Sequence, residues 1–198
     1  IDPKAENEQV TEEEIRMMVD IGEEKGVIEE SEAELIENVF EFNNITAADV
    51  MVHRTDMTAL CIRDSAEEIL SVIRESGFSR FPVYDEDADD IIGVLSTREF
   101  LLNAQSASPQ PLEKLLRAPY LVPETIRADV LLREMQIKKA HMAIVLDEYG
   151  GTSGLITMED LLEEIVGEIY DEFDEQEAQD IQPLEENLWR IQGGAPLD

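Results

Sequence analysis

The sequence predicts an α/β fold built from two copies of one structural repeat, with a helical segment before the pair and an acidic helix after it. Residues 60–102 align with residues 121–163 without a gap, and matched residues lie 61 positions apart. The clearest matched pairs are Leu60 with Leu121, Pro82 with Ala143, Gly93 with Gly154, and Ser96 with Thr157. One copy is too small to bury both faces of its sheet, so we expect the two copies to pack as one folding unit.

Each copy predicts strand, helix, strand, strand and helix in that order, from apolar periods of about two and 3.6 residues. In the first copy the expected elements are a strand at Leu60, a helix over 66–75, strands over 81–85 and 91–95, and a helix from Ser96. In the second copy they are a strand at Leu121, a helix over 128–138, strands over 142–147 and 154–156, and a helix from Thr157.

Helical patterns flank the pair. Thr11 with Glu14, and Ser31 with Glu34, match the capping-box pattern, so two amphipathic helices are expected before the repeats. A brief turn over 46–51 and a short helix over 111–117 each precede a repeat. After the second copy, apolar residues at helical spacing predict one long acidic helix over 159–173.

These patterns divide the 198 residues into five expected segments. They are a helical linker (1–45), the first repeat (46–104), the second repeat (111–166), an acidic helix and linker (167–187), and the beginning of a further domain (188–198). The chain starts at Ile1 and stops soon after a strand-like run at 188–191, so we expect it to be part of a longer protein.

The charge of the chain excludes some partners. A formal net charge of −32, from 47 acidic and 15 basic residues, disfavours nucleic-acid binding, because phosphate neutralisation needs basic surface. It also disfavours docking on anionic lipid. No apolar run in the sequence approaches the roughly 18 residues of a membrane span. The single cysteine, Cys61, lies in an apolar strand pattern and is expected to be an ordinary core thiol.

The sequence also argues against catalysis and against a protein metal site. It shows no nucleophile with a base, no triad and no metal-ligand cluster. Residues 85–90 imitate an EF-hand loop, but Asp90 stands where that loop needs glycine, so a solvated acidic turn is the better interpretation. His53 and His141 lack neighbours at zinc-ligand spacing. Loose Mg²⁺ binding by the acidic helix stays open beside a plain solvated face.

The most informative local motif covers residues 154–160 and has its counterpart at 93–99. A strand ends and a helix begins there, so Thr157 is a natural N-cap whose first-turn amides can accept a phosphate. Asp160, one turn further, can face the same cleft and accept hydrogen bonds from ribose hydroxyls. The alternative interpretation is a capping box without a ligand.

Together with the run GFSRFPVY at residues 77–84, this repeated motif closely resembles the cystathionine-beta-synthase (CBS) domain pair, or Bateman module, over roughly residues 46–165. The runs KAHMAIVLDEYGGTSGLITMEDLLEEIVGEI and EDLLEEIVGEIYDEFD further resemble the cytosolic part of the CorC/HlyC group, which includes CorB, CorC and CNNM proteins. This resemblance implies tandem CBS repeats that bind ATP or another adenine nucleotide with Mg²⁺. It also implies a homodimer at the cytoplasmic face of a bacterial cell membrane, next to its own transmembrane domain.

Carried onto this sequence, the resemblance implies one nucleotide site between the copies. Its residues would be Thr55, Met57, Ser79, Arg80, Phe81 and Pro82 with Thr157 and Asp160. Arg80 would supply positive charge that the acidic chain otherwise lacks. The pseudo-symmetric second site would use Val122, His141, Met142 and Ala143 with Ser96 and Glu99. It has no arginine, and glutamate and alanine replace aspartate and proline, so we expect it to be empty or weak.

The resulting hypothesis is a regulatory, non-catalytic CBS pair of a membrane magnesium or cobalt efflux protein. Mg-ATP would favour one arrangement of the pair, and the N-terminal helices would transmit that preference to the transmembrane domain. Two alternatives stay open. One is a soluble CorC-like accessory protein that senses AMP or ATP, and the other is a regulatory pair whose catalytic domain lies outside this sequence.

Overall fold

The computed structural model describes residues 10–87, 89–167, 181–185 and 188–191, and it describes side chains within the first two of these ranges. The chain divides into two units, Ile1–Gly167 and Glu168–Asp198. In the second unit β8 (Ile181–Glu185) pairs antiparallel with β9 (Leu188–Ile191), where the sequence predicted a strand. No helix in the described ranges combines the length and the apolar character that a membrane span requires.

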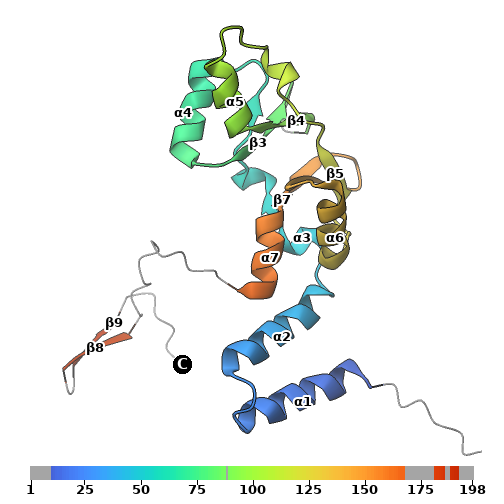
Figure 1. Ribbon diagram of the computed structural model, residues 1–198, viewed down its shortest axis with the longest axis vertical. Coiled ribbons are helices and arrows are strands. Elements are labelled where there is room, and N and C mark those ends of the chain that lie inside the picture. Colours follow the sequence, from blue (N-terminus) through green and yellow to red (C-terminus); the bar gives the residue numbers. More distant parts are fainter. Residues whose placement is uncertain (1–9, 88, 168–180, 186–187, 192–198) are drawn as a thin grey trace, which may run out of the picture. The chain divides into compact units, whose positions relative to one another are not determined.

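The first unit contains the two predicted repeats (Figure 1). The first repeat consists of β2 (Leu60–Cys61), α4 (Ala66–Ser76), β3 (Arg80–Tyr84), β4 (Ile91–Ser96) and α5 (Thr97–Ala104). The second consists of β5 (Tyr120–Pro123), α6 (Ala128–Lys138), β6 (Met142–Leu146), β7 (Thr152–Thr157) and α7 (Met158–Val166). In both, the first strand runs parallel to the second and the second antiparallel to the third. The predicted tandem α/β fold is confirmed.

The gap-free alignment of the two copies is wrong by one residue over its first half. Val83 pairs with Gly93 in the first sheet, whereas Val145 pairs with Gly154 in the second, so the turn over 85–90 is one residue longer than its counterpart. Equivalent residues are therefore 62 positions apart up to β3 and β6, and 61 positions apart from Gly93 and Gly154 onward.

Burial agrees with the corrected alignment of the strands. Leu60 is 1% exposed and its counterpart Val122 is 3% exposed, whereas Leu121, the residue expected to match Leu60, is 49% exposed. The counterpart of Arg80 is Met142, because each residue pairs with the N-cap of the following helix. The position that Arg80 occupies in the first repeat therefore carries no charge in the second.

The chain ahead of each repeat joins the sheet of the other repeat. The strand β1 (Val52–His53) pairs antiparallel with β7, which gives the sheet order β1-β7-β6-β5, and Arg117 forms an antiparallel bridge with Val94 of β4. Both crossings pass over a glycine. A Cβ atom on Gly154 would lie 2.3 Å from the Val52 carbonyl oxygen, and one on Gly93 would lie 3.0 Å from the Arg117 carbonyl oxygen. Only glycine permits such close backbone approach.

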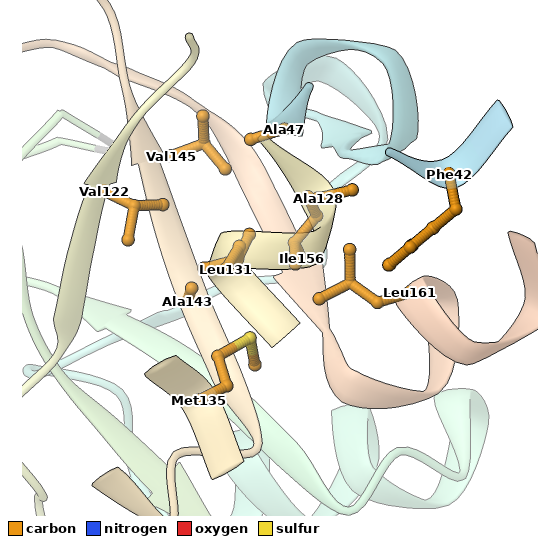
Figure 2. Close-up of a cluster of buried hydrophobic side chains, with 10 residues drawn as sticks. All are labelled: Phe42, Ala47, Val122, Ala128, Leu131, Met135, Ala143, Val145, Ile156 and Leu161. Atoms are coloured by element: carbon orange, nitrogen blue, oxygen red, sulfur yellow. The ribbon is translucent and has the colours of Figure 1, made fainter. Parts of the chain in front are cut away.

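The core of the second repeat includes residues that precede the first repeat. Phe42 and Ala47 pack with Leu131, Ile156 and Leu161 (Figure 2). The backbone amide of Ala47, in α3 (Ala47–Val50), donates to the Ile126 carbonyl at 2.8 Å. A second core fills the first repeat, and a third cluster joins the two repeats through Met142, Ile144 and Leu155, with Met57, Ile91, Val94 and Leu146 packed against it.

Two helices precede the repeats. α1 (Glu12–Glu24) begins with the predicted capping box at Thr11, but α2 (Glu30–Phe42) begins before the box predicted at Ser31. That prediction was wrong because Glu29 is the N-cap, and its amide donates to Glu32 Oε2 at 3.0 Å.

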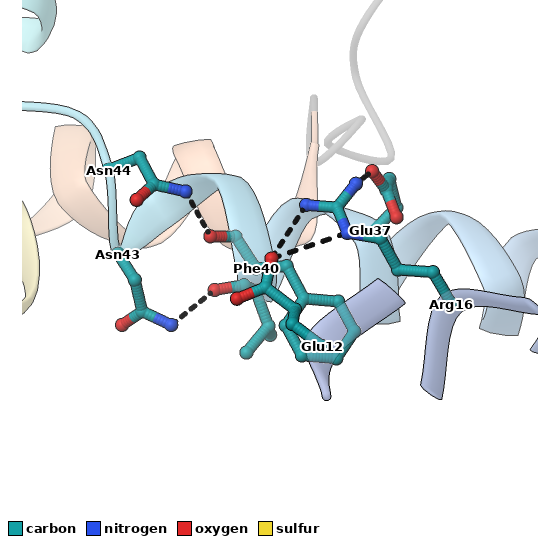
Figure 3. Close-up of polar contacts among 7 residues, drawn as sticks. Glu12, Arg16, Glu37, Phe40, Asn43 and Asn44 are labelled. Carbon is teal, nitrogen blue, oxygen red and sulfur yellow. Dashed lines mark hydrogen bonds and ion pairs between the residues drawn. The ribbon is translucent and has the colours of Figure 1, made fainter. Parts of the chain in front are cut away.

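Arg16 joins these helices, because its guanidinium pairs with Glu12 and Glu37 and lies 5.2 Å from the centroid of the Phe40 ring (Figure 3). At the far end of α2, the side-chain amides of Asn43 and Asn44 donate to carbonyls one turn back, Asn44 to that of Phe40. Arg16 therefore ties α1 to α2, and the two asparagine side chains cap the end of α2.

Two further helix predictions need correction. The helix expected over 111–117 is only a 3₁₀ turn, η2 (Leu112–Lys114), because Pro119 disfavours helical backbone at Ala118 and the chain extends to pair with Val94. The acidic helix expected as far as residue 173 ends at Val166, because Gly167 caps it with φ of 75°. Residues 168–173 lie outside the described residues.

Candidate functional site

A cavity of about 390 Å³ lies between the two repeats, a volume typical of small-molecule sites. Four chain segments line it: the stretch from β1 to Thr58, the turn before β3 with the first residue of that strand, the start of β6, and the end of β7 with the first turn of α7. Its lining residues are Val52, Asp56, Met57, Thr58, Gly77, Phe78, Ser79, Arg80, Met142, Leu155, Thr157, Glu159 and Asp160. We call it the first cavity.

The first cavity brings together five of the eight residues that the sequence nominated. They are Met57, Ser79, Arg80, Thr157 and Asp160. The remaining three do not line it. Phe81 and Pro82 are fully buried within β3, and Thr55 lies exposed in the 3₁₀ turn η1 (Arg54–Asp56).

Sequence reasoning missed the aromatic residue of the first cavity. Phe78 is 55% exposed at the turn before β3, and its ring centroid lies 6.1 Å from that of Phe81. The sequence contained a usable signal for Phe78. This residue comes directly after Gly77, which ends α4 with a φ of 69°, and it precedes the strand that enters the core. The acidic lining residues Asp56 and Glu159 were also missed.

Thr157 and Asp160 form the capping box that the sequence predicted. Thr157 Oγ1 accepts from the Asp160 amide at 3.2 Å, and Asp160 Oδ2 accepts from the Thr157 amide at 2.7 Å. In this capping box, Asp160 Oδ2 and Thr157 Oγ1 each accept one backbone hydrogen bond. It leaves Asp160 Oδ1 and the Thr157 hydroxyl proton for other partners.

The charge of the first cavity fits a phosphate chain that carries its own cation. Asp56, Glu159 and Asp160 line it against the single cation Arg80, so a bare polyanion would be repelled. No group of three or more metal-binding side chains occurs in the part of the chain that the structure describes. Mg²⁺ usually keeps several of its bound waters and is held by one or two carboxylates together with phosphate oxygens. A Mg²⁺ ion would therefore enter the first cavity together with a phosphate-bearing ligand.

An ion pair holds η1 next to the first cavity. Arg54 Nη1 lies 2.6 Å from Asp89 Oδ1, and the same oxygen accepts from the Thr152 amide of β7 at 3.1 Å. Asp89 belongs to the longer turn of the first repeat. That turn therefore connects the lining segment to the sheet of the second repeat.

A second cavity of about 760 Å³ occupies the pseudo-symmetric position. Of the residues nominated for it, Ser96, Glu99, His141 and Met142 line it, whereas Val122 and Ala143 are buried in the core. The position equivalent to Arg80 is Met142 and carries no arginine, as expected, but other positions bring arginines to the cavity. Arg80, Arg98 and Arg117 line it together with Lys138 and Lys139.

One edge of the second cavity is a polar network between Tyr120 of β5 and two residues of α6. Tyr120 Oη donates to Glu134 Oε2 at 2.5 Å, and Lys138 Nζ lies 2.6 Å from the same oxygen. Burial raises the pKa of Tyr120, and the Glu134 carboxylate adds to this effect. The hydrogen bond from Lys138 holds the pKa of Glu134 below its usual value, so this carboxylate is ionised at neutral pH.

Two structural repeats, each contacted by the chain ahead of the other and with paired cavities between them, define a tandem-repeat module. The chain belongs to the CBS domain family, whose profile matches residues 47–105 and 114–167. It is 40% identical to the magnesium and cobalt efflux protein CorC of Salmonella typhimurium over 173 residues. The alignment covers 87% of this chain and 59% of that protein. The chain thus spans a little over half the length of that relative.

Solved structures of CBS pairs show the same fold. One is the CBS domain of a bacterial CNNM/CorC family Mg²⁺ transporter, with a TM-score of 0.76 and 40% identity over 82% of this chain and 99% of that one. Another is such a domain in complex with ATP, with a TM-score of 0.65 and 39% identity over 69% of this chain and 97% of that one. The predicted CBS pair of the CorC/CNNM type is confirmed.

Proposed function

We propose that this CBS pair is the regulatory, Mg-ATP-binding module of a membrane protein that exports divalent cations such as magnesium or cobalt. The observation that carries the proposal is the first cavity, where Arg80 of one repeat meets Thr157 and Asp160 of the other. The similarity to a CNNM/CorC family CBS domain in complex with ATP supports the choice of ligand.

Each part of the ligand has a matching part of the first cavity. The exposed ring of Phe78 and the apolar side chains of Val52 and Met57 offer a surface on which adenine can stack. Asp160 Oδ1 offers an acceptor for ribose hydroxyls. Arg80 and the hydroxyl of Thr157 offer donors to phosphate oxygens, and Mg²⁺ offsets the repulsion from Asp56 and Glu159.

A continuous set of contacts leads from the first cavity to the N-terminal helices. The first turn of α7 lines the cavity, and near its other end the Ile165 carbonyl accepts from Asn38 Nδ2 of α2 at 3.4 Å. α2 in turn is joined to α1 through Arg16. A ligand with different affinity for two arrangements of the repeats would therefore bias the position of α2. In the full-length protein this bias reaches the transmembrane domain, at the cytoplasmic face of the membrane and in a homodimer.

The test is isothermal titration of ATP into the chain, with Mg²⁺ and with EDTA. We expect Mg-dependent binding that Arg80→Ala weakens by roughly tenfold or more, because a hydrogen bond to a charged group contributes about 1.5–3 kcal/mol. Thr157→Ile should abolish it, because the sec-butyl side chain lacks the hydroxyl donor and crowds the position of the phosphate, whereas Thr157→Ser should retain it. Titrations of ADP and AMP rank the nucleotides.

Arg63→Ala is the matched control, because Arg63 is an exposed arginine that pairs with Asp85 and does not line the first cavity. Its affinity for Mg-ATP should equal that of the parent chain. If no adenine nucleotide produces heat or raises the melting temperature, the pair is a structural unit and the proposal fails.

A further inference from the structure

Asp89 makes contacts that the second repeat does not reproduce. It lies in the turn over 85–90, which is one residue longer than the corresponding turn of the second repeat. In that shorter turn the side chain of Asp147 accepts from two amides of its own turn. In the longer turn Asp87 takes this local role by accepting from the Asp89 amide at 2.8 Å. The carboxylate of Asp89 is thereby left to bond outside its turn.

One carboxylate oxygen of Asp89 joins three parts of the fold. Asp89 Oδ1 lies 2.6 Å from Arg54 Nη1 in η1 and 3.1 Å from the amide nitrogen of Thr152 in β7, while Asp89 itself belongs to the first repeat. An ionised acceptor strengthens both hydrogen bonds. This contact therefore connects the first repeat to η1 and to the sheet of the second repeat at a single atom.

The 3₁₀ turn η1 is weakly closed by its own backbone. The Met57 amide donates to the Arg54 carbonyl at 3.4 Å, longer than the roughly 2.7–3.2 Å that is usual. A short turn with such a bond depends on outside contacts for its position. Asp56 in this turn and Met57 directly after it line the first cavity. The contact between Arg54 and Asp89 therefore bears on the shape of that cavity.

We propose that Asp89 is a positioning residue for Mg-ATP in the first cavity, an inference that rests on the proposed function. Asp89 does not line the cavity and acts through Arg54, by holding Asp56 and Met57 opposite the first turn of α7. The same oxygen also bonds to β7, whose end leads into α7, so one carboxylate of the first repeat holds two lining segments in place.

The charge of Asp89 separates this role from a long-range electrostatic effect. Loss of a carboxylate from a chain with a net charge of −32 should strengthen the binding of an anion through the overall field. Loss of a positioning contact should weaken it. Asp85 is the matched control, because it lies in the same turn and pairs with Arg63 rather than with η1 or β7.

The test is titration of Mg-ATP into the whole chain and its variants at constant ionic strength. Asp89→Ala should raise the dissociation constant on the order of fivefold, because it removes an ion pair and a hydrogen bond from an amide to a charged acceptor. Asp89→Asn keeps an oxygen that can accept from Arg54 and Thr152, so its affinity should stay within about twofold of the parent chain. Asp85→Ala should bind at least as tightly as the parent.

A double variant shows whether Asp89 acts through Arg54. Arg54→Ala should also weaken binding, and Arg54→Ala with Asp89→Ala should bind no more weakly than Asp89→Ala alone, because both changes release the same contact. The melting temperatures should stay close to that of the parent, since the two side chains are 45% and 44% exposed.

Three results overturn the positioning role while the parent chain binds Mg-ATP. They are parental affinity in Asp89→Ala, an equal loss of affinity in Asp85→Ala, and losses in the two single variants that add in the double variant. A parent chain that does not bind Mg-ATP overturns the proposed function, and the positioning role with it.

Discussion

Gly154→Ala should destabilise the chain by roughly 3 kcal/mol, at the upper end of the cost of overpacking. The added Cβ atom would lie 2.3 Å from the Val52 carbonyl oxygen and 3.0 Å from the sulfur of Met51. The carbonyl belongs to a strand that pairs with β7 and cannot rotate away as a side chain can. For a chain of this size we expect the melting temperature, followed by circular dichroism, to fall by roughly 6–12 °C.

The same substitution should weaken Mg-ATP binding, because β1 leads into the lining of the first cavity at Val52, Asp56 and Met57. Gly22→Ala is the control. Its nearest neighbour is the flexible side chain of Ile28, and alanine favours the helix α1, so stability should change little. A Gly154→Ala chain that melts with the parent would show that β1 does not cross β7 at this distance.

The resemblance to CBS pairs, carried onto the repeat, made the central part of the candidate site predictable. Arg80 and Asp160 are far apart in the sequence, yet the repeat places the start of one strand opposite the first turn of the other copy's helix. The repeat shows which residues of the two copies are equivalent, and the resemblance to CBS pairs implies which of them meet. The same reasoning located Ser96 and Glu99 at the second cavity.

The errors come from features that periodicity does not encode. The extra residue in the turn over 85–90 has no apolar pattern, so the alignment slipped and gave Arg80 the wrong counterpart. Phe78 and Phe81 are both aromatic residues close to Arg80, and the position of Phe78 directly after the glycine that ends α4, which separates it from the buried strand residue Phe81, was not used. Arg98 and Arg117 were missed because their cavity is assembled from α5 of one repeat and the segment ahead of the other.

Phe78 and Phe81 should respond in opposite ways to substitution. Phe81 is 0% exposed and packs in the core of the first repeat with Leu60, Ile69 and Leu95, so Phe81→Ala should cost about 3–5 kcal/mol of stability. Phe78 is 55% exposed, so Phe78→Ala should cost little more than the aromatic pair, about 0.5–1.5 kcal/mol. Chemical denaturation of the two variants checks this difference.

The affinity for Mg-ATP should show the reverse order, with a larger loss at Phe78 than at Phe81. If adenine stacks on Phe78, loss of that ring removes about 1–3 kcal/mol, and the dissociation constant for Mg-ATP should rise on the order of tenfold. Phe81→Leu, which keeps an apolar side chain in the core, should bind Mg-ATP within about twofold of the parent chain while melting at a lower temperature. A Phe81→Leu chain of parental stability with weakened binding would instead assign the aromatic contact to Phe81. The pair of variants thereby separates a ring that supports the sheet from a ring that meets the ligand.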